Sequence, residues 1–166
     1  MAPDVNVLIA AYREDHVHHP VARAWLAQSV AACATGGAIE ILPMVGAGFL
    51  RLVTNRKIFP VGASSPDQAV AFLRSLLAVR GVVMPSLGPE WGLFEKLCVD
   101  LRVAGPAVTD AWIAAAVSAG GLHLVTFDES FRKLLRPSEF TLLRPGSRIA
   151  ARRAKYTVHR PQRAEA

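Results

Sequence analysis

The last third of the chain alternates helix and strand patterns with little loop between them, and this alternation limits the possible folds most. A nearly all-apolar stretch at 109–121 ends in a glycine pair, as buried helices often do. A strand pattern at 122–127, a short helical pattern at 128–135 and a last strand pattern at 139–145 follow it. Because strands that alternate with helices form mostly parallel sheets, we predict a three-layer α/β/α domain with a mostly parallel central sheet.

The preceding residues continue the alternation. Helical patterns occur at 20–33, 44–54, 66–79 and 89–102, and short strand patterns at 38–42 and 81–86. The first apolar run, 5–12, fits either a buried strand or the start of a buried helix. A chain of 166 residues with this organisation and no internal repeat is expected to fold around one core.

Positive charge is concentrated at the end of the chain. Residues 144–166 contain seven Lys and Arg and one Glu, which accounts for the whole net charge of +6, and residues 1–143 are balanced. The apolar periodicity also stops near 145. We therefore predict one folded domain at 1–144 and a basic, poorly ordered tail at 145–166. Such a tail is typical of an arm for nucleic acid, and a solvated end without a partner fits equally well.

Several classes of protein are excluded by what the sequence lacks. No apolar run approaches the roughly 18 residues that span a bilayer, and no basic leader opens the chain, so we expect a cytoplasmic protein without membrane contact. Cys33 and Cys98 have no zinc-finger spacing and are expected to be free thiols. His16, His18 and His19 resemble a zinc ligand set, but without a nearby thiol a surface or packing role is favoured.

Three aspartates stand where strand and helix patterns meet. Asp4 precedes the first apolar run, Asp110 opens a helical pattern after Thr109, and Asp128 follows a strand pattern. Ligands of open parallel sheets bind at the carboxyl ends of strands, which is where Asp128 lies. Taken singly, Asp110 or Thr109 and Asp128 are explained better by helix capping than by a functional role.

Asp4 is harder to explain as a cap alone. It lies beside a strongly apolar run, so its carboxylate risks burial and then needs a partner or a cation. Carboxylates that converge without Lys or Arg repel each other, and a divalent cation removes that repulsion. Mg²⁺ prefers carboxylates, waters and phosphate oxygens, which is the arrangement of metal-assisted phosphodiester cleavage.

Three segments together resemble one known family. Residues 3–26, 48–59 and 108–131 are similar, in order and spacing, to the PIN-domain nucleases, in particular the VapC-type toxins of bacterial type II toxin–antitoxin systems. The resemblance extends over about 3–143. It implies that the first strand ends at the first aspartate and that the following apolar run is helical.

The resemblance also implies roles for individual residues. Asp4, Asp110 and Asp128 match the family's metal-binding and catalytic acids. Asn6 matches a polar position that supports the first acid, and Thr126 matches the threonine of the TxD turn. Ser130, where many relatives have another aspartate, completes the predicted supporting residues.

Two departures from the family pattern reduce the negative charge of the site. The family usually has a glutamate in the helix that corresponds to 44–50, where this chain has Gly46 and Gly48. The nearest acid, Glu40, lies upstream in a strand pattern, so the role is not transferred to it. Ser130 is the second departure. We expect weaker metal affinity, or a single ion, as the physical consequence.

The resemblance therefore implies an endoribonuclease toxin that depends on Mg²⁺ or Mn²⁺ and cleaves structured RNA, such as tRNA or rRNA, to arrest translation. It also implies a cognate antitoxin and a homodimer. Arg51 is a candidate for phosphate contact, and Arg152 and Arg153 are candidates in the tail.

Two alternatives remain at this point. The first is a catalytically weak PIN-like domain that binds RNA or a protein partner, as the missing glutamate would favour. The second is a phospho-receiver domain, which ranks last because no aspartate lies between Asp15 and Asp67, where a central strand would have to supply one.

Overall fold

The central sheet is built from short parallel strands. The structure, a computed structural model, describes residues 1–144, so the predicted tail with Arg152 and Arg153 lies outside the described residues. Strands β1 (Ala2–Pro3), β4 (Leu124–Thr126) and β5 (Phe140–Leu142) form one parallel sheet in the order β1-β4-β5. The first strand of the chain is thus paired with a strand that comes about 120 residues later.

A second pair of strands extends this sheet. Strands β2 (Ile39–Glu40) and β3 (Val82–Val83) are parallel to each other. The amide of Glu40 donates to the carbonyl of Met1 at 2.9 Å, which joins β2 to the edge of β1. The spatial order is therefore β3, β2, β1, β4, β5, and every strand pairing is parallel, as predicted.

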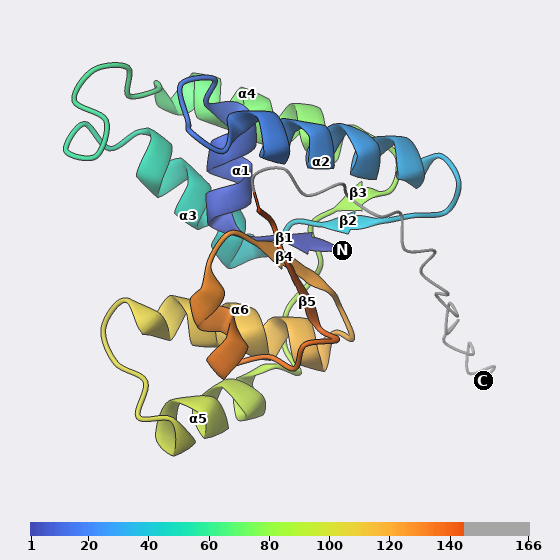
Figure 1. Ribbon diagram of the computed structural model, residues 1–166, viewed down its shortest axis with the longest axis vertical. Coiled ribbons are helices and arrows are strands. Elements are labelled where there is room, and N and C mark those ends of the chain that lie inside the picture. Colours follow the sequence, from blue (N-terminus) through green and yellow to red (C-terminus); the bar gives the residue numbers. More distant parts are fainter. Residues whose placement is uncertain (145–166) are drawn as a thin grey trace, which may run out of the picture.

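Helices cover both faces of the strands (Figure 1). On one side lie α1 (Val5–Tyr12), α2 (His19–Cys33), α3 (Pro43–Val53) and α4 (Pro66–Leu77). On the other side lie α5 (Trp91–Asp100), α6 (Ala107–Ala119) and the 3₁₀ helix η1 (Glu129–Lys133). This confirms the three-layer α/β/α prediction. No helix within residues 1–144 is long and apolar enough to cross a membrane.

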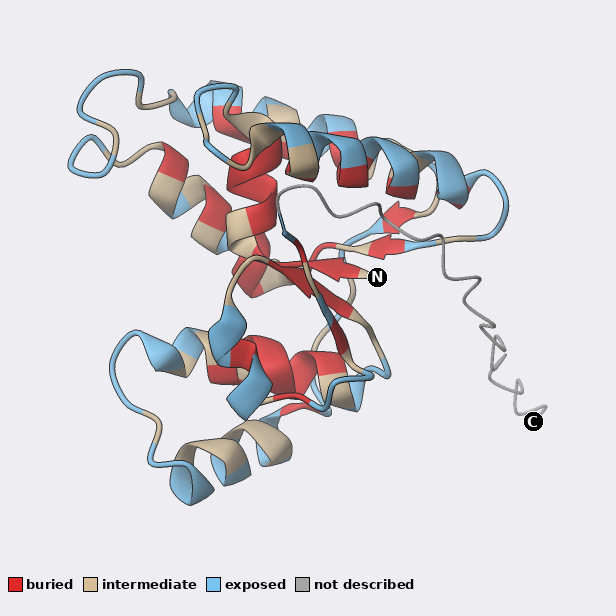
Figure 2. Ribbon diagram, viewed as in Figure 1, coloured by how far each residue is buried: buried red, intermediate tan, exposed pale blue. Residues whose placement is uncertain are grey.

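The core lies where the sheet meets α1 and α6 (Figure 2). Helix α1 has five consecutive buried residues, so the apolar run that fitted two structures is a helix buried almost all round. Helix α6 is mostly alanine on its buried side, which lets its backbone approach the strands closely. By contrast, α5 has no buried residue.

Every predicted helix and strand is present, with ends that differ by at most three residues. The difference that matters is at α6, which begins at Ala107 and has Pro106 as its N-cap. Proline fixes a helix-compatible φ, and the preceding Gly105 turns the chain with a φ of 59°. Capping is therefore the wrong explanation for Asp110 and Thr109, because both lie inside the first turn.

Candidate active site

Asp4 is held at the junction between β1 and α1. Its Oδ1 accepts a hydrogen bond from the Val5 amide at 2.6 Å, so it is the N-cap of α1. Its Oδ2 accepts from Asn6 Nδ2 and from Thr126 Oγ1, both at 2.6 Å. The residue is only 5% exposed. A buried carboxylate with three donors has a fixed orientation, and a carboxylate has roughly four lone-pair positions, so about one remains free on Oδ1.

Thr126 and Asn6 connect this carboxylate to the far end of the sequence. The buried Thr126 hydroxyl donates to Asp4 and accepts from Asn6 Nδ2 at 3.0 Å and from the Asp128 amide at 2.9 Å. Asn6 Oδ1 accepts from the Phe127 amide at 3.2 Å. One hydroxyl therefore uses its donor and both acceptor positions, and the start of α1 is locked to the 126–128 turn.

Asp128 lies on this turn. Its Oδ1 accepts from the Ser130 amide at 2.7 Å, so it does cap η1, as the simpler explanation expected. Ser130 contributes this backbone donor, and its side chain is exposed at the position where relatives have a further acid. Capping and a role in the site are compatible, because the second carboxylate oxygen is not used by the cap.

The acids of the site influence one another electrostatically. Burial raises the pKa of Asp4 to about 6, hydrogen bonds from Thr126 and Val5 oppose this, and the negative charges of Asp110 and Asp128 add to it. The pKa of Asp110 is also raised, first by burial and then by the charge of Asp128. Within residues 1–144 the ion pairs involve other carboxylates, so no described Lys or Arg compensates these three.

The three aspartates are close enough to interact through their charges, but they are not arranged as a finished metal cage. No group of three or more His, Cys, Asp or Glu among the described residues is positioned to hold one ion. Asp4 is fixed by its donors, whereas Asp110 is half-buried on the first turn of α6. The arrangement is an acidic cluster with one rigid carboxylate and two less constrained ones.

Helix α3 supplies no acid to this cluster, and its packing explains why. A Cβ on Gly48 would lie 2.9 Å from Cγ2 of Val5, the residue after Asp4. A Cβ on Gly46 would lie 3.2 Å from Cε of Met84. Glycine at 48 therefore lets α3 approach the first turn of α1 closely, in space that a side chain would need. Glu40 is not a substitute, because it is not among the charges that shift the pKa of Asp4. Its charge acts on the Met1 amine, whose pKa burial lowers against the opposing effect of Glu40.

Among the described residues, the predicted Arg51 makes no hydrogen bond or ion pair with this network. Arg51 is exposed in the last turn of α3, and the structure describes neither Arg152 nor Arg153. A residue that sequence analysis did not connect with the site is His18, whose ring stacks on Phe127 with centroids 4.5 Å apart. The sequence signal that could have indicated this contact is Phe127, the aromatic residue in the middle of the TxD turn.

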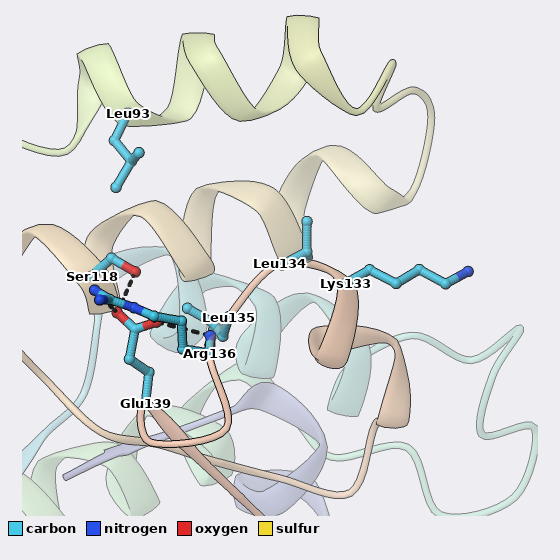
Figure 3. Close-up of a pocket in the computed structure, with 7 residues that line it drawn as sticks. All are labelled: Leu93, Ser118, Lys133, Leu134, Leu135, Arg136 and Glu139. Atoms are coloured by element: carbon cyan, nitrogen blue, oxygen red, sulfur yellow. Dashed lines mark hydrogen bonds and ion pairs between the residues drawn. The ribbon is translucent and has the colours of Figure 1, made fainter.

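A separate pocket of about 390 Å³ opens between α5, α6 and the η1–β5 segment (Figure 3). Leu93, Ser118 and Glu139 are among its lining residues. Ser118 Oγ donates to Glu139 Oε1 at 2.9 Å, and Arg136 pairs with the same carboxylate at 3.2 Å. None of the residues of the aspartate network lines this pocket, so it is separate from the acidic site.

Comparison with known proteins agrees with this fold. The family model described as PIN domain matches residues 1–136. Ribonuclease VapC25 of Mycobacterium tuberculosis (strain ATCC 25618 / H37Rv) is 34% identical over 131 residues, which are 78% of this chain and 89% of that protein. Ribonuclease VapC38 of the same strain is 35% identical over 126 residues, covering 75% of this chain and 82% of that protein.

A solved structure shares the fold. A chain of the crystal structure of VapBC2 from Rickettsia felis bound to a DNA fragment from their promoter superimposes with a TM-score of 0.59. The match covers 84% of this chain and 94% of that chain, at 17% sequence identity. At that identity the likeness concerns the arrangement of helices and strands.

Proposed function

Because the chain belongs to the PIN-domain family, with VapC ribonucleases among its relatives, we propose that it is the endoribonuclease toxin of a toxin–antitoxin pair. We further propose that it depends on Mg²⁺ or Mn²⁺ and that Asp4, Asp110 and Asp128 are its metal-binding and catalytic acids. Structured RNA, such as tRNA or rRNA, is the proposed substrate class.

The observation that supports this proposal best is the environment of Asp4. It is a buried carboxylate with its pKa raised to about 6, beside two further aspartates and without a described cationic partner. Buried charge of one sign is costly unless it is paired or coordinates a metal. All the groups present are oxygen donors, which fits a hard divalent cation such as Mg²⁺ or Mn²⁺.

Each residue of the site would then have a distinct task. Thr126 and Asn6 orient Asp4 and leave about one lone-pair position for a ligand. The Ser130 amide holds one oxygen of Asp128, and the cap leaves the other oxygen unused. Bound Mg²⁺ or Mn²⁺ supplies the positive charge that polarises a phosphodiester and acidifies an attacking water. No side-chain nucleophile is required.

The proposed partners follow from family membership. For a toxin of this type we expect an antitoxin that covers the acidic cluster. We also expect a second copy of the chain, in a homodimer. The neighbouring reading frame is the simplest check of the first point, because a short upstream gene for a small DNA-binding protein would support the toxin role.

The second candidate function is a PIN-like domain that binds RNA or a protein but cleaves weakly. Gly46 and Gly48 favour it, since α3 contributes no carboxylate at these positions and has no space for one at 48 without movement of Val5. With fewer acids, metal affinity is expected to be modest.

One experiment separates the two functions. The purified chain is incubated with total RNA in Mg²⁺ or Mn²⁺, with and without a chelator, beside the variants Asp4→Asn and Asp67→Asn. Asp67 is the matched control, because it is an exposed acid in the first turn of α4. The nuclease proposal expects chelator-sensitive cleavage that is lost in Asp4→Asn and kept in Asp67→Asn. RNA binding without cleavage in the unmodified chain would favour the second function.

A further inference from the structure

Two segments that are far apart in the sequence stack their aromatic rings beside the acidic cluster. His18, the last residue before α2, stacks on Phe127 with centroids 4.5 Å apart and planes inclined by 14°. Phe127 is the middle residue of the turn between Thr126 and Asp128. The His16 ring lies against the His18 ring, with centroids 5.6 Å apart and planes tilted by 49°, and its Nδ1 accepts the His18 amide at 3.1 Å. The α1–α2 connection therefore presents an ordered aromatic face to the turn.

The backbone around Phe127 is part of the hydrogen-bond network of the site. Its amide donates to Asn6 Oδ1, and the next amide, of Asp128, donates to Thr126 Oγ1. A rotation of the Phe127 side chain and its backbone would disturb both bonds. The Asp4 carboxylate accepts from both Asn6 and Thr126, so such a disturbance would reach it.

The imidazole of His18 does not gain a hydrogen bond from this position. Its Nδ1 is buried and has no partner among the described residues. A buried polar atom without a partner costs free energy. The contact that holds the His18 ring in place is therefore its stack on Phe127. Phenylalanine at 18 would keep a ring face towards Phe127 and remove the unpartnered nitrogen. That substitution therefore separates stacking from any polar role.

We propose that His18 is a positioning residue: it holds the Phe127 ring so that the 126–128 turn keeps Thr126 and Asp128 in place beside Asp4. The proposal rests on the proposed function to the extent that this turn belongs to the catalytic site. His18 itself is not expected to touch the substrate or the metal. The α1–α2 connection thereby becomes part of the support of the site.

The test measures amide hydrogen exchange in the metal-free chain for three variants. His18→Ala removes the stack, His18→Phe keeps it, and Val17→Ala is the matched control in the same connection, because Val17 is 81% exposed. We expect exchange of the Phe127 and Asp128 amides to rise at least tenfold in His18→Ala. In His18→Phe and Val17→Ala it should stay at the level of the unmodified chain. The amide of Ile113, in the core of α6, should be unchanged in all three.

Two outcomes of the exchange experiment overturn the proposal. Unchanged exchange at Phe127 and Asp128 in His18→Ala would show that the ring does not hold the turn. Faster exchange throughout, including Ile113, would show that His18 stabilises the whole domain and not the turn.

Cleavage kinetics give a second readout that a purely stabilising residue would not move. With RNA and Mn²⁺, kcat should fall about tenfold in His18→Ala with unchanged KM, and His18→Phe should restore it. A rise in KM with unchanged kcat would assign His18 to RNA contact and overturn the positioning role. If the unmodified chain cleaves no RNA, the proposed function fails, and the exchange result still decides what His18 does.

Discussion

Two buried acids at helix starts have opposite electrostatic environments. Asp4 at the start of α1 and Glu90 at the start of α5 are each 5% exposed. Burial and two neighbouring aspartates raise the pKa of Asp4 to about 6. Burial also raises the pKa of Glu90, but hydrogen bonds from the Gly88 amide, its own amide and Trp112 together lower it below its ordinary value.

The difference lies in what surrounds each carboxylate. Glu90 Oε2 accepts from the Gly88 amide at 2.7 Å and Oε1 from Trp112 Nε1 at 3.3 Å, and no other acid contributes to its pKa. Its charge is stabilised locally, as in a structural acid. Asp4 has more donors and still keeps a raised pKa, because burial outweighs them and the charges of Asp110 and Asp128 add to its effect. Burial alone therefore does not identify a functional acid, whereas burial together with uncompensated neighbouring acids does.

The largest expected difference between the two acids is in catalysis. We expect Asp4→Asn to lower RNA cleavage by roughly a hundredfold or more, equivalent to about 3 kcal/mol of transition-state stabilisation. Glu90→Gln should leave cleavage nearly unchanged. Both variants are compared by initial rates on one RNA with Mn²⁺. Equal losses of cleavage in the two variants would contradict a catalytic Asp4 beside a structural Glu90.

The two acids should also affect stability with opposite dependence on pH. A folded-state pKa above the unfolded value means that the folded state binds more protons, so the contribution of Asp4 grows as pH falls from about 7 to 4. A shift from 3.8 to about 6 corresponds to about 3 kcal/mol at most. The lowered pKa of Glu90 has the reverse sign, and its contribution is lost as pH falls through its folded-state pKa.

Urea unfolding with a chelator, at pH 7, 6, 5 and 4, measures this pair of trends. The unmodified chain should gain stability relative to Asp4→Asn as the pH falls, and lose stability relative to Glu90→Gln. If the difference in free energy of unfolding between the unmodified chain and Asp4→Asn stays constant across the series, folding does not raise the pKa of Asp4.

Two glycines near these acids extend the comparison from electrostatics to the packing around each helix start. Gly48→Ala places a methyl group 2.9 Å from Val5 Cγ2, and we expect it to destabilise the domain by about 1–3 kcal/mol. Gly92→Ala in the first turn of α5 meets nothing within 4 Å and should stabilise by about 0.4–1 kcal/mol, since alanine restricts the unfolded chain more than glycine does. Thermal melts compare the two. A Gly48→Ala variant as stable as the unmodified chain would show that α3 and α1 have room between them.

The smallest expected effect is stabilisation by metal. A cation at roughly ten times its Kd stabilises a folded protein by about 1.4 kcal/mol. We expect Mn²⁺ and Mg²⁺ to raise the melting temperature of the unmodified chain and of Glu90→Gln but not of Asp4→Asn. An equal rise in all three would place the bound ion elsewhere. Zn²⁺ preference, lost on replacement of His16 and His18, would contradict an all-oxygen site.

Much of the fold could be predicted from local pattern, because each helix and strand has its own periodicity. The apolar run at 5–12 was ambiguous, since a fully buried element lacks the polar face that reveals its period. Family resemblance resolved it. The start of α6 was misjudged because Thr109 and Asp110 are good caps, whereas Pro106 begins the helix earlier.

The site was predicted less completely. Resemblance supplied Asp4, Asn6 and Thr126 as candidates, but no local pattern indicates that one hydroxyl joins residues more than a hundred positions apart. The stack of His18 on Phe127 is likewise a product of tertiary packing. Opposite pKa shifts at Asp4 and Glu90 depend on neighbours that only the folded chain brings together.

The bond between Asp4 and Thr126 also bears on when this protein becomes active during its own synthesis. The two residues are 122 positions apart, and β1 pairs with β4, so the cluster of acids cannot assemble until the end of the domain has been made. At about 5–20 residues per second, that interval is on the order of ten seconds. A nascent ribonuclease would therefore stay inert beside the ribosome that produces it, which gives a partner time to reach it first.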